Sequence, residues 1–435
     1  MKKVLIVAEL SHASPRIPDL AKYLPEFDWE PIILTGSTSK EGLHQPPNEI
    51  FEKCRVIQTL SPNIIASLKR RIGLKPEKTL QEQVGFPLLT KEKKKSFFGK
   101  IINFIKEIIA YPDALRGWKP FAVKRGSEVI EREDIKALIS SSSPIIAHII
   151  AKELKKKYKI PWIADLRDLW TQNHDYQYSK VRKFFEQKLE LKTLKDANAL
   201  VTVSPIWADR LKKLHKRDTV YTITNGFDPE KINIPPADLT NKFTITYTGS
   251  FYPEKQNPSK LFSALRELID EKKIDPTDIE VRFYGPKQEW LEKEIEEYQL
   301  SDIAKQYGLI PREISFQKQR ESQILLLLNW EDYKERGWYP LKTFEYLAAQ
   351  RPILVVGGSG DDVVKKLLSE TKSGVYGKEI EDIKDSFLKF YLEYKQKGKV
   401  SYFGDVEKIN KYSYKEMAEK FAKILNQITS YVKRN

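Results

Sequence analysis

Two charged residues stand three positions apart in an otherwise apolar segment, "YPLKTFEYLAAQRPILVV", residues 339–356. Pro340 suits the first turn of a helix, so Lys342 and Glu345 would share one face near a helix N-terminus. Because the free N–H groups and the dipole of such a terminus attract anions, Lys342 is a candidate to bind a phosphate. Glu345 is a candidate to accept two hydrogen bonds from a ribose diol. The alternative interpretation is a solvated first turn with an ion pair between the two side chains.

A second segment, "YTGSFYPEKQNPSKLF" (residues 247–262), runs from a predicted strand through a loop into a helix that begins near Pro258. Gly249 and Ser250 follow the strand, and a glycine at that place lets a ligand approach the backbone. Lys255 then becomes a candidate to close over a diphosphate. The order strand, glycine, loop and helix is common in proteins, so this motif alone is a weak signal.

Polar residues also gather where two predicted strands of the first half end. In "SSSSPIIAHIIAKEL" four serines, Ser143 among them, precede His148, and "PWIADLRDLW" places Asp165, Arg167 and Asp168 after another strand. These are our catalytic candidates, because both strand ends would line the same cleft. The alternative interpretations are a packed histidine and a local ion network. Neither group has a Ser-His-Asp order or a metal-ligand spacing that names a reaction.

Short β-rich runs alternate with helical patterns along most of the chain. Many of the runs are continuously apolar, as expected for parallel strands that are covered on both faces, and the helices between them supply the crossovers. The predicted fold class is α/β, with two Rossmann-like doubly wound parallel-sheet domains facing a cleft. The predicted strands are residues 3–8, 31–35, 54–57, 135–140, 161–165, 199–204, 220–224, 243–249, 280–285, 314–316, 324–328 and 352–358.

The pattern restarts after a stretch rich in Pro, Asn and Asp, which we interpret as a linker. The predicted domains are an N-terminal domain (1–225) with a basic insertion (64–106), a linker (226–242), and a C-terminal domain (243–410). Residues 411–435 are predicted to form a last helix, and the sequence does not decide which of the two domains it packs on. In such sheets ligands bind beyond the carboxyl ends of the strands.

The composition limits the class of protein. With 435 residues, 40% hydrophobic and 11% aromatic, the chain has enough apolar residues for two or three domains and is not disordered throughout. A single cysteine, Cys54, excludes internal disulfides and thiolate metal clusters and fits a reducing compartment. The first apolar run spans only about six residues before Glu9, too short for a signal peptide. No run of about 18 apolar residues is present. We expect a cytoplasmic protein.

The net charge of +15, from 75 Lys and Arg against 60 Asp and Glu, predicts an anionic partner. Residues 64–106 contain eleven Lys or Arg and three Glu, and the segment "KKKSFFGKIINFIKEIIA" follows a basic amphipathic helical pattern with aromatic residues. Such a helix lies on an anionic membrane surface, or packs against a core in the alternative interpretation. No helix-turn-helix, RNA-recognition or zinc-finger signature accompanies the charge, so we expect no nucleic acid partner.

These motifs together resemble a known family. "YPLKTFEYLAAQRPILVVGG", "YTGSFYPEK", "VRFYGP", "VTVSPIWADRL" with "TITNGFD", and "PWIADLRDLWT" are similar to segments of retaining glycosyltransferases of the family 4 type, which have the GT-B fold, and they occur along the chain in the expected order. The resemblance implies that the N-terminal domain binds the acceptor and the C-terminal domain the nucleotide sugar. The N-terminal "SPRIPDLAKYLPEFDWEPIILTG" resembles the opening of a bacterial subgroup active on surface polysaccharides. The resemblance covers most of the chain except the basic insertion.

The resemblance implies roles for single residues of the sugar-donor site. Glu345 would bind the donor ribose, Lys255 and Lys342 the diphosphate without a metal or other cofactor, and Gly285 would lie by the nucleobase, with Gly249 letting the phosphates near the backbone. Arg16 and Ser143 are expected on the acceptor or phosphate side.

The chain departs from the family at two positions. Gly337 stands where the family often has Glu, eight positions before the ribose residue, and Ser250 stands where it often has Arg. Four charged residues nearby are candidate substitutes: Glu331, Asp332, Glu335 and Arg336.

The implied reaction moves a sugar from a nucleotide-diphosphate donor to a polysaccharide or lipid-linked acceptor with retention of configuration, and Asp168 is a candidate to orient the acceptor. A membrane-peripheral enzyme of this kind is our first hypothesis. A nucleotide-sugar epimerase of the same fold and a non-catalytic sugar-binding or scaffold relative are the alternatives. The basic insertion argues against the epimerase, and Gly337 with Ser250 supports the scaffold.

Overall fold

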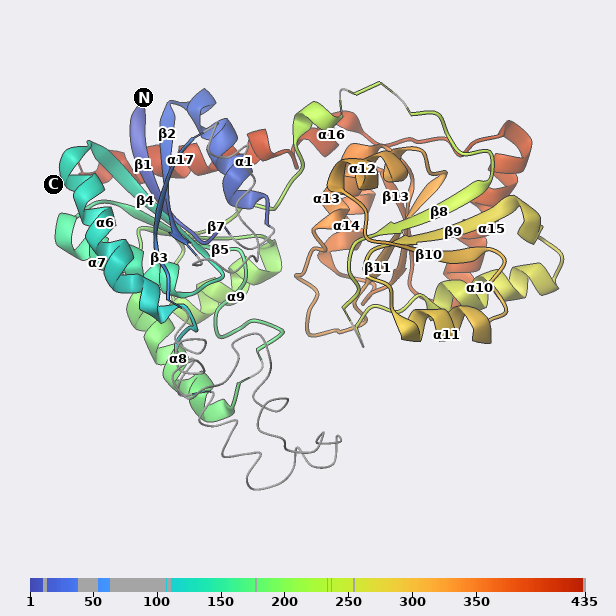
Figure 1. Cartoon of the computed structure of the whole chain (residues 1–435), viewed down its shortest axis with the longest axis horizontal. Coiled ribbons are helices and arrows are strands. Elements are labelled where there is room, and N and C mark those ends of the chain that lie inside the picture. The colour runs from blue at the N-terminus through green and yellow to red at the C-terminus, as the bar shows by residue number, and fades with distance from the viewer. Residues whose placement is uncertain are drawn as a thin grey trace. The chain divides into compact units, whose positions relative to one another are not determined.

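The computed structural model describes residues 1–10, 14–37, 54–62, 107, 111–176, 178–232, 234–235, 237–252 and 255–432. The basic insertion predicted at 64–106 lies outside these residues. The chain divides into two compact units, which Figure 1 draws with their elements labelled. The first unit holds Met1–Ile223 together with Ala418–Asn435, and the second holds Thr224–Met417. Residues 226–242, predicted as the linker, thus group with the second unit.

The first unit is built on a seven-stranded sheet in the order β3-β2-β1-β4-β5-β6-β7. Every neighbouring pair in it is parallel, and the strand order reverses direction between β1 and β4. Parallel strands need crossover helices, and α7 packs against α6, β1 and β4. The strands are β1 (Lys2–Val7), β2 (Trp29–Ser37), β3 (Arg55–Leu60), β4 (Ile135–Ser142), β5 (Trp162–Leu166), β6 (Ala199–Thr202) and β7 (Val220–Thr222). The helices are α1 (Arg16–Tyr23), α6 (Lys119–Arg132), α7 (Ile146–Tyr158), α8 (Lys180–Leu194), α9 (Pro205–His215) and most of α17 (Tyr414–Val432).

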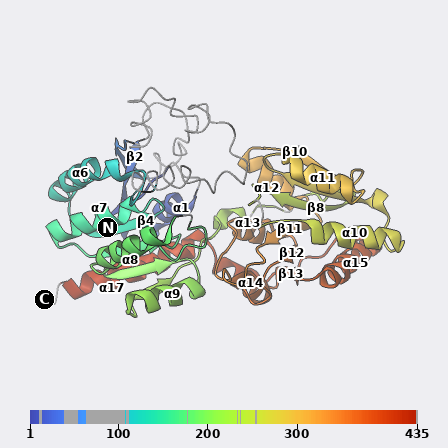
Figure 2. The ribbon, with the colours of Figure 1, turned by 90° about the horizontal axis from the view of Figure 1, so that it is seen from below.

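The second unit is built on a six-stranded parallel sheet in the order β10-β9-β8-β11-β12-β13. Its strands are β8 (Phe243–Thr248), β9 (Ile279–Tyr284), β10 (Ala304–Gly308), β11 (Ile324–Asn329), β12 (Ile353–Gly357) and β13 (Gly374–Gly377). Its helices are α10 (Ser259–Asp270), α11 (Glu289–Glu297), α12 (Arg312–Arg320), α13 (Lys342–Ala349), α14 (Val363–Thr371), α15 (Ile380–Lys397) and α16 (Val406–Asn410). Figure 2 shows these helices around the sheet from below.

The run "ILLLL" in β11 is continuously apolar because both faces of the strand are covered. Leu326 and Leu328 belong to the core under α10, α11 and α15, whereas Leu325 and Leu327 belong to the core under α13 and α14. Alternate residues of a strand point to opposite faces, so each face of the sheet receives its own set of leucines. The prediction of an α/β fold with two parallel sheets is confirmed.

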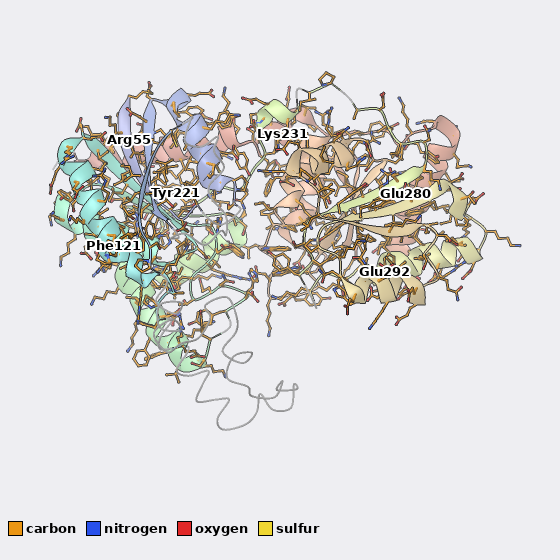
Figure 3. All side chains as sticks on the ribbon, viewed as in Figure 1. Arg55, Phe121, Tyr221, Lys231, Glu280 and Glu292 are labelled. Atoms are coloured by element: carbon orange, nitrogen blue, oxygen red, sulfur yellow. The ribbon has the colours of Figure 1, made fainter. Side chains whose placement is uncertain are left out.

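The sequence prediction was wrong about three elements. Residues 314–316, predicted as a strand, lie inside α12, and β10 and β13 were not predicted. Both missed strands are at the edges of the sheet, and neither has an apolar run. On β10, Tyr307 points its hydroxyl at Glu280 of β9, which Figure 3 labels. Edge strands of this kind carry polar side chains, which hides them from a search for apolar runs.

A buried ion pair joins α1 to the sheet of the first unit. Arg16 donates from Nη2 to Asp165 Oδ1 at 2.8 Å and from Nε to Oδ2 at 3.0 Å, and Nη2 also donates to the Ile223 carbonyl at 3.0 Å. Ser141 Oγ donates to Asp165 Oδ2 at 2.8 Å, and the Arg16 guanidinium lies 5.4 Å from the ring centroid of Phe421 on α17.

No helix in the described residues is long and apolar enough to cross a membrane.

We expect Arg16→Met and Asp165→Leu to destabilise the protein singly by about 3–5 kcal/mol, because each leaves an uncompensated buried charge. The double variant should recover much of this loss, since two apolar side chains of similar size replace the pair. Thermal unfolding of the three variants measures both effects. A double variant as unstable as the sum of the two singles would contradict this account.

Candidate functional site

The candidate site of the second unit begins where β8 and β9 end. Gly249, after β8, has φ +103°, a conformation that side chains disfavour, and its N–H donates to the Tyr284 carbonyl at 2.7 Å. Gly285, after β9, lies so close to Gly249 that a Cβ there would be 2.3 Å from the Gly249 carbonyl oxygen. Both positions therefore require glycine, and a ligand could approach the backbone there without a side chain in between.

The amine of Lys342 lies beside Gly249. Lys342 is the first residue of α13, and its Nζ is 3.6 Å from the ring centroid of Tyr247 on β8. A Cβ on Gly249 would be 3.4 Å from this Nζ. The Nζ is buried and makes no hydrogen bond in the described part of the chain. Burial lowers the pKa of the Lys342 amine to about 7, and the carboxylate of Glu345 opposes this shift. An anion at Gly249 would give the amine a charged partner.

Glu345 faces a partner on another helix. Its Oε1 accepts a hydrogen bond from Nη2 of Arg312, the first residue of α12, at 3.2 Å, and the side chain is 29% exposed. The alternative interpretation of the sequence was an ion pair between Lys342 and Glu345. Among the residues that the structure describes, Glu345 pairs with Arg312 instead, and the Lys342 amine has no hydrogen-bond partner. Glu345 keeps enough exposure to accept hydrogen bonds from a hydroxyl-bearing ligand.

An aromatic stack that the sequence analysis did not find lies between the loop after β11 and the loop after β8. Trp330, just after β11, stacks on Trp338 with ring centroids 3.9 Å apart and 16° between the planes. Tyr252 meets both rings edge-on, and the Nζ of Lys255 lies 4.4 Å from the Trp330 ring centroid. The signal was present as two tryptophans eight positions apart, but the residues between them are mostly polar and follow no apolar period that would indicate a contact.

The two departures from the family pattern lie close to this stack. Ser250 is exposed, and its carbonyl accepts a hydrogen bond from Tyr247 Oη at 2.9 Å. Gly337 is buried just before Trp338. Two of the candidate substitutes are engaged elsewhere: Glu331 pairs with Lys260 at 2.8 Å, and Arg336 pairs with Asp361.

Two of the four catalytic candidates of the first unit, Asp165 and His148, are interior groups. Asp165 forms a buried ion pair with Arg16, which was predicted on the acceptor or phosphate side. His148 is fully buried on α7, with Nδ1 2.7 Å from Ser140 Oγ, which also accepts a hydrogen bond from Trp162 Nε1 at 2.8 Å. Burial lowers the pKa of His148 to about 4, against the pull of Asp165. This matches the alternative interpretation of a packed histidine.

Arg167 and Asp168 lie after β5 and reach the surface of the first unit. Arg167 Nη2 and Asp168 Oδ2 are 3.4 Å apart, and the Asp168 side chain is 39% exposed. Ser143 is half-buried after β4, on the same edge of the sheet. Catalytic or acceptor roles for these residues stay predictions. Among the described residues, no group of three or more His, Cys, Asp or Glu side chains is arranged to hold a metal ion.

Comparison with known proteins bears on the family and the fold. The model named Glycosyltransferase Family 4 matches residues 88–231, and no match was found among curated proteins. Sucrose-phosphate synthase from Thermosynechococcus elongatus is 10% identical, with 99% of this chain and 100% of that chain covered and a TM-score of 0.62. A glycosyltransferase from Rickettsia africae is 15% identical, with 98% of each chain covered and a TM-score of 0.60.

HepE from Anabaena, solved in complex with UDP, is 12% identical, with 98% of this chain and 100% of that chain covered and a TM-score of 0.63. At these identities the structures establish a shared fold. Together with the two parallel α/β sheets, they show that the chain has the GT-B fold, and its residues 88–231 are similar to glycosyltransferase family 4.

Proposed function

We propose that this chain transfers a sugar from a nucleoside diphosphate donor to a polysaccharide or lipid-linked acceptor, with retention of configuration. The observation that carries the proposal is the buried amine of Lys342, which has no hydrogen-bond partner in the described residues and lies beside Gly249. A buried amine without a partner is costly to keep. A diphosphate at Gly249 supplies the missing charge. The likeness to HepE, which was solved with UDP, supports a nucleotide at this fold.

The residues around Lys342 divide the work of binding the sugar donor. The first N–H groups of α13 point toward anions that approach its N-terminus. Lys342 holds the phosphates, and Glu345, positioned by Arg312, accepts hydrogen bonds from the ribose hydroxyls. Lys255 approaches the phosphates from the loop after β8, where the Trp330 ring supports its side chain.

In this proposal, positively charged side chains catalyse the reaction by stabilising the diphosphate leaving group. Breaking the bond to the sugar leaves negative charge on the diphosphate and an oxocarbenium-like centre on the sugar. The cations Lys342 and Lys255 stabilise the developing negative charge, and a preformed arrangement of this kind is usually the largest contribution to such catalysis. Asp168, exposed after β5, is proposed to orient the acceptor hydroxyl.

The proposal also includes the place of action. We propose a cytoplasmic protein that binds peripherally to an anionic membrane through residues 64–106. Their eleven cationic residues support this assignment. A lipid-linked acceptor would then be reached at the membrane surface.

A thermal-shift screen with UDP, GDP, ADP, CDP and TDP tests the sugar-donor site. We expect one diphosphate to stabilise the wild type by about 2.7 kcal/mol at one hundred times its dissociation constant. Glu345→Ala should weaken this shift, whereas Glu381→Ala, an exposed residue on α15, should leave it unchanged. If no nucleotide shifts the wild type, the chain is a non-catalytic relative. A product assay with the stabilising base then separates transfer from epimerisation.

The affinity for the diphosphate should fall as the pH rises above 7. The amine of Lys342 has its pKa lowered to about 7 by burial, so above pH 7 it is largely neutral in the free protein and must take up a proton to bind the anion. The nucleotide phosphate ionises near pH 6 and stays fully charged in this range. We expect the dissociation constant to rise by at most about tenfold per pH unit between pH 7 and 9. Calorimetric titration measures it.

Lys342→Met is the informative variant for this pH dependence. It should remove the pH dependence above pH 7 and weaken binding by about 1.5–3 kcal/mol, the usual contribution of a hydrogen bond to a charged group. It should also stabilise the free protein at pH 7, since a buried amine is replaced by an apolar chain. Lys389→Met, exposed on α15, is the matched control. Unchanged pH dependence in Lys342→Met would exclude this lysine as the titrating group.

A further inference from the structure

Helix α8 of the first unit buries charged side chains and exposes apolar ones, the reverse of an ordinary surface helix. Its buried positions include Arg182, Glu186, Glu190 and Thr193. Its exposed positions include Val181, Phe184, Phe185 and Leu191, with Phe184 and Phe185 54% and 55% exposed. A surface helix normally turns its apolar stripe toward the core. The exposed apolar stripe of α8 (the green helix labelled in Figure 1) therefore needs an explanation of its own.

The buried charges of α8 are satisfied within the first unit. Arg182 Nε donates to Glu186 Oε1 at 2.6 Å, and Tyr176 Oη donates to Glu186 Oε2 at 3.0 Å. Glu190 accepts a hydrogen bond from the N–H of Thr171 at 3.1 Å, and its Oε1 is 3.3 Å from His215 Nε2. Both acidic residues of α8 are thus used in the interior, and none remains on its outer face.

The outer face of α8 carries only cations among its charged residues. Lys180, Lys183, Lys188 and Lys192 are exposed beside the apolar stripe, and none of them forms an ion pair within the described ranges of the chain. The Nζ of Lys188 lies 4.2 Å from the ring centroid of Phe184. A lysine whose stem lies along a ring and whose amine is free suits a boundary between an apolar layer and water.

A hollow continues this face at the N-terminal end of the helix. It has a volume of about 460 Å³ and is lined by Glu107, Tyr111, Arg116, Ser179, Val181, Arg182 and Phe185. The Glu107 carboxylate accepts hydrogen bonds from the Ser179 N–H at 3.0 Å and from Ser179 Oγ at 2.5 Å. The hollow thus continues the apolar surface beyond the helix, with two guanidinium groups and a carboxylate that is already hydrogen-bonded.

We propose that the outer face of α8, with its phenylalanines and lysines, docks on an anionic lipid bilayer. A bilayer offers both acidic headgroups for the lysines and an acyl layer for Phe184 and Phe185. A second copy using the same face would oppose lysine to lysine in a two-fold interface. Residues 64–106 are themselves strongly basic, so their net charge does not complement the lysines of this face. Charge complementarity therefore favours an anionic membrane over a second copy of the chain and over residues 64–106.

The inference deepens the proposed function, because it places the first unit at the surface where a lipid-linked acceptor would lie. Docking does not depend on the sugar-donor site, which belongs to the second unit. Vesicle binding and nucleotide binding can therefore fail separately, and each is measured without the other.

The test is sedimentation of the full chain with vesicles of phosphatidylcholine alone and with about 30% phosphatidylglycerol added. We expect binding to the anionic vesicles only, weakened roughly tenfold or more by Phe184→Ser/Phe185→Ser and by Lys183→Glu/Lys188→Glu. The matched controls are Leu392→Ser/Phe403→Ser and Lys366→Glu/Lys389→Glu, exposed residues of the second unit. They should bind as the wild type does.

Three results would overturn the proposal. The wild type could fail to bind anionic vesicles, or the α8 variants could bind as well as their controls, which would assign any membrane binding to other residues. Conversion of a dimer to a monomer by Phe184→Ser/Phe185→Ser in gel filtration would make the face an interface between copies. Melting temperatures equal to those of the controls establish that the variants are folded, and the nucleotide-induced shift should be unchanged in all of them.

Discussion

The sugar-donor site depends on a close approach of two backbone segments that only glycine allows. Gly285 leaves no room for a Cβ against the Gly249 carbonyl oxygen, and Gly249 itself has a positive φ. Because no side chain stands at either position, the amine of Lys342 reaches the ends of β8 and β9 directly. A methyl group at 285 would push the two strand ends apart, and the lysine would then face a side chain or solvent in place of backbone.

The buried Lys342 amine lowers the stability of the free protein and favours the binding of an anion. The Lys342 amine is buried over the Tyr247 ring and makes no hydrogen bond in the described chain, so the free protein bears a desolvation cost that an anionic ligand removes. Arg16 shows the opposite solution in the first unit, where Asp165 and the Ile223 carbonyl satisfy the buried guanidinium. A buried cation with hydrogen-bond partners, such as Arg16, stabilises the fold. A buried cation without a partner in the described residues, such as Lys342, can bind an anionic ligand.

The sequence predicted the central strands, because apolar runs are local features. It named Lys342 and Gly249 only as separate candidates, and the structure places them side by side. It missed β10 and β13, edge strands that lack an apolar run. It could not find the partner of Asp165, because Arg16 lies 149 positions away, nor the partner of Glu345, which is Arg312 on another helix. Long-range contacts decide which polar residues at a strand end remain accessible, and a single sequence does not contain them.

The helix α17 has a consequence for the order in which the protein forms. Its first residues belong to the second unit, and from Ala418 onward it belongs to the first, where Phe421 covers Arg16. During synthesis the whole second unit is therefore translated before the segment that completes the first. Domains usually fold one after another as they leave the ribosome. In this chain the first unit therefore lacks Phe421, which lies over the Arg16 guanidinium, until the whole second unit has been translated.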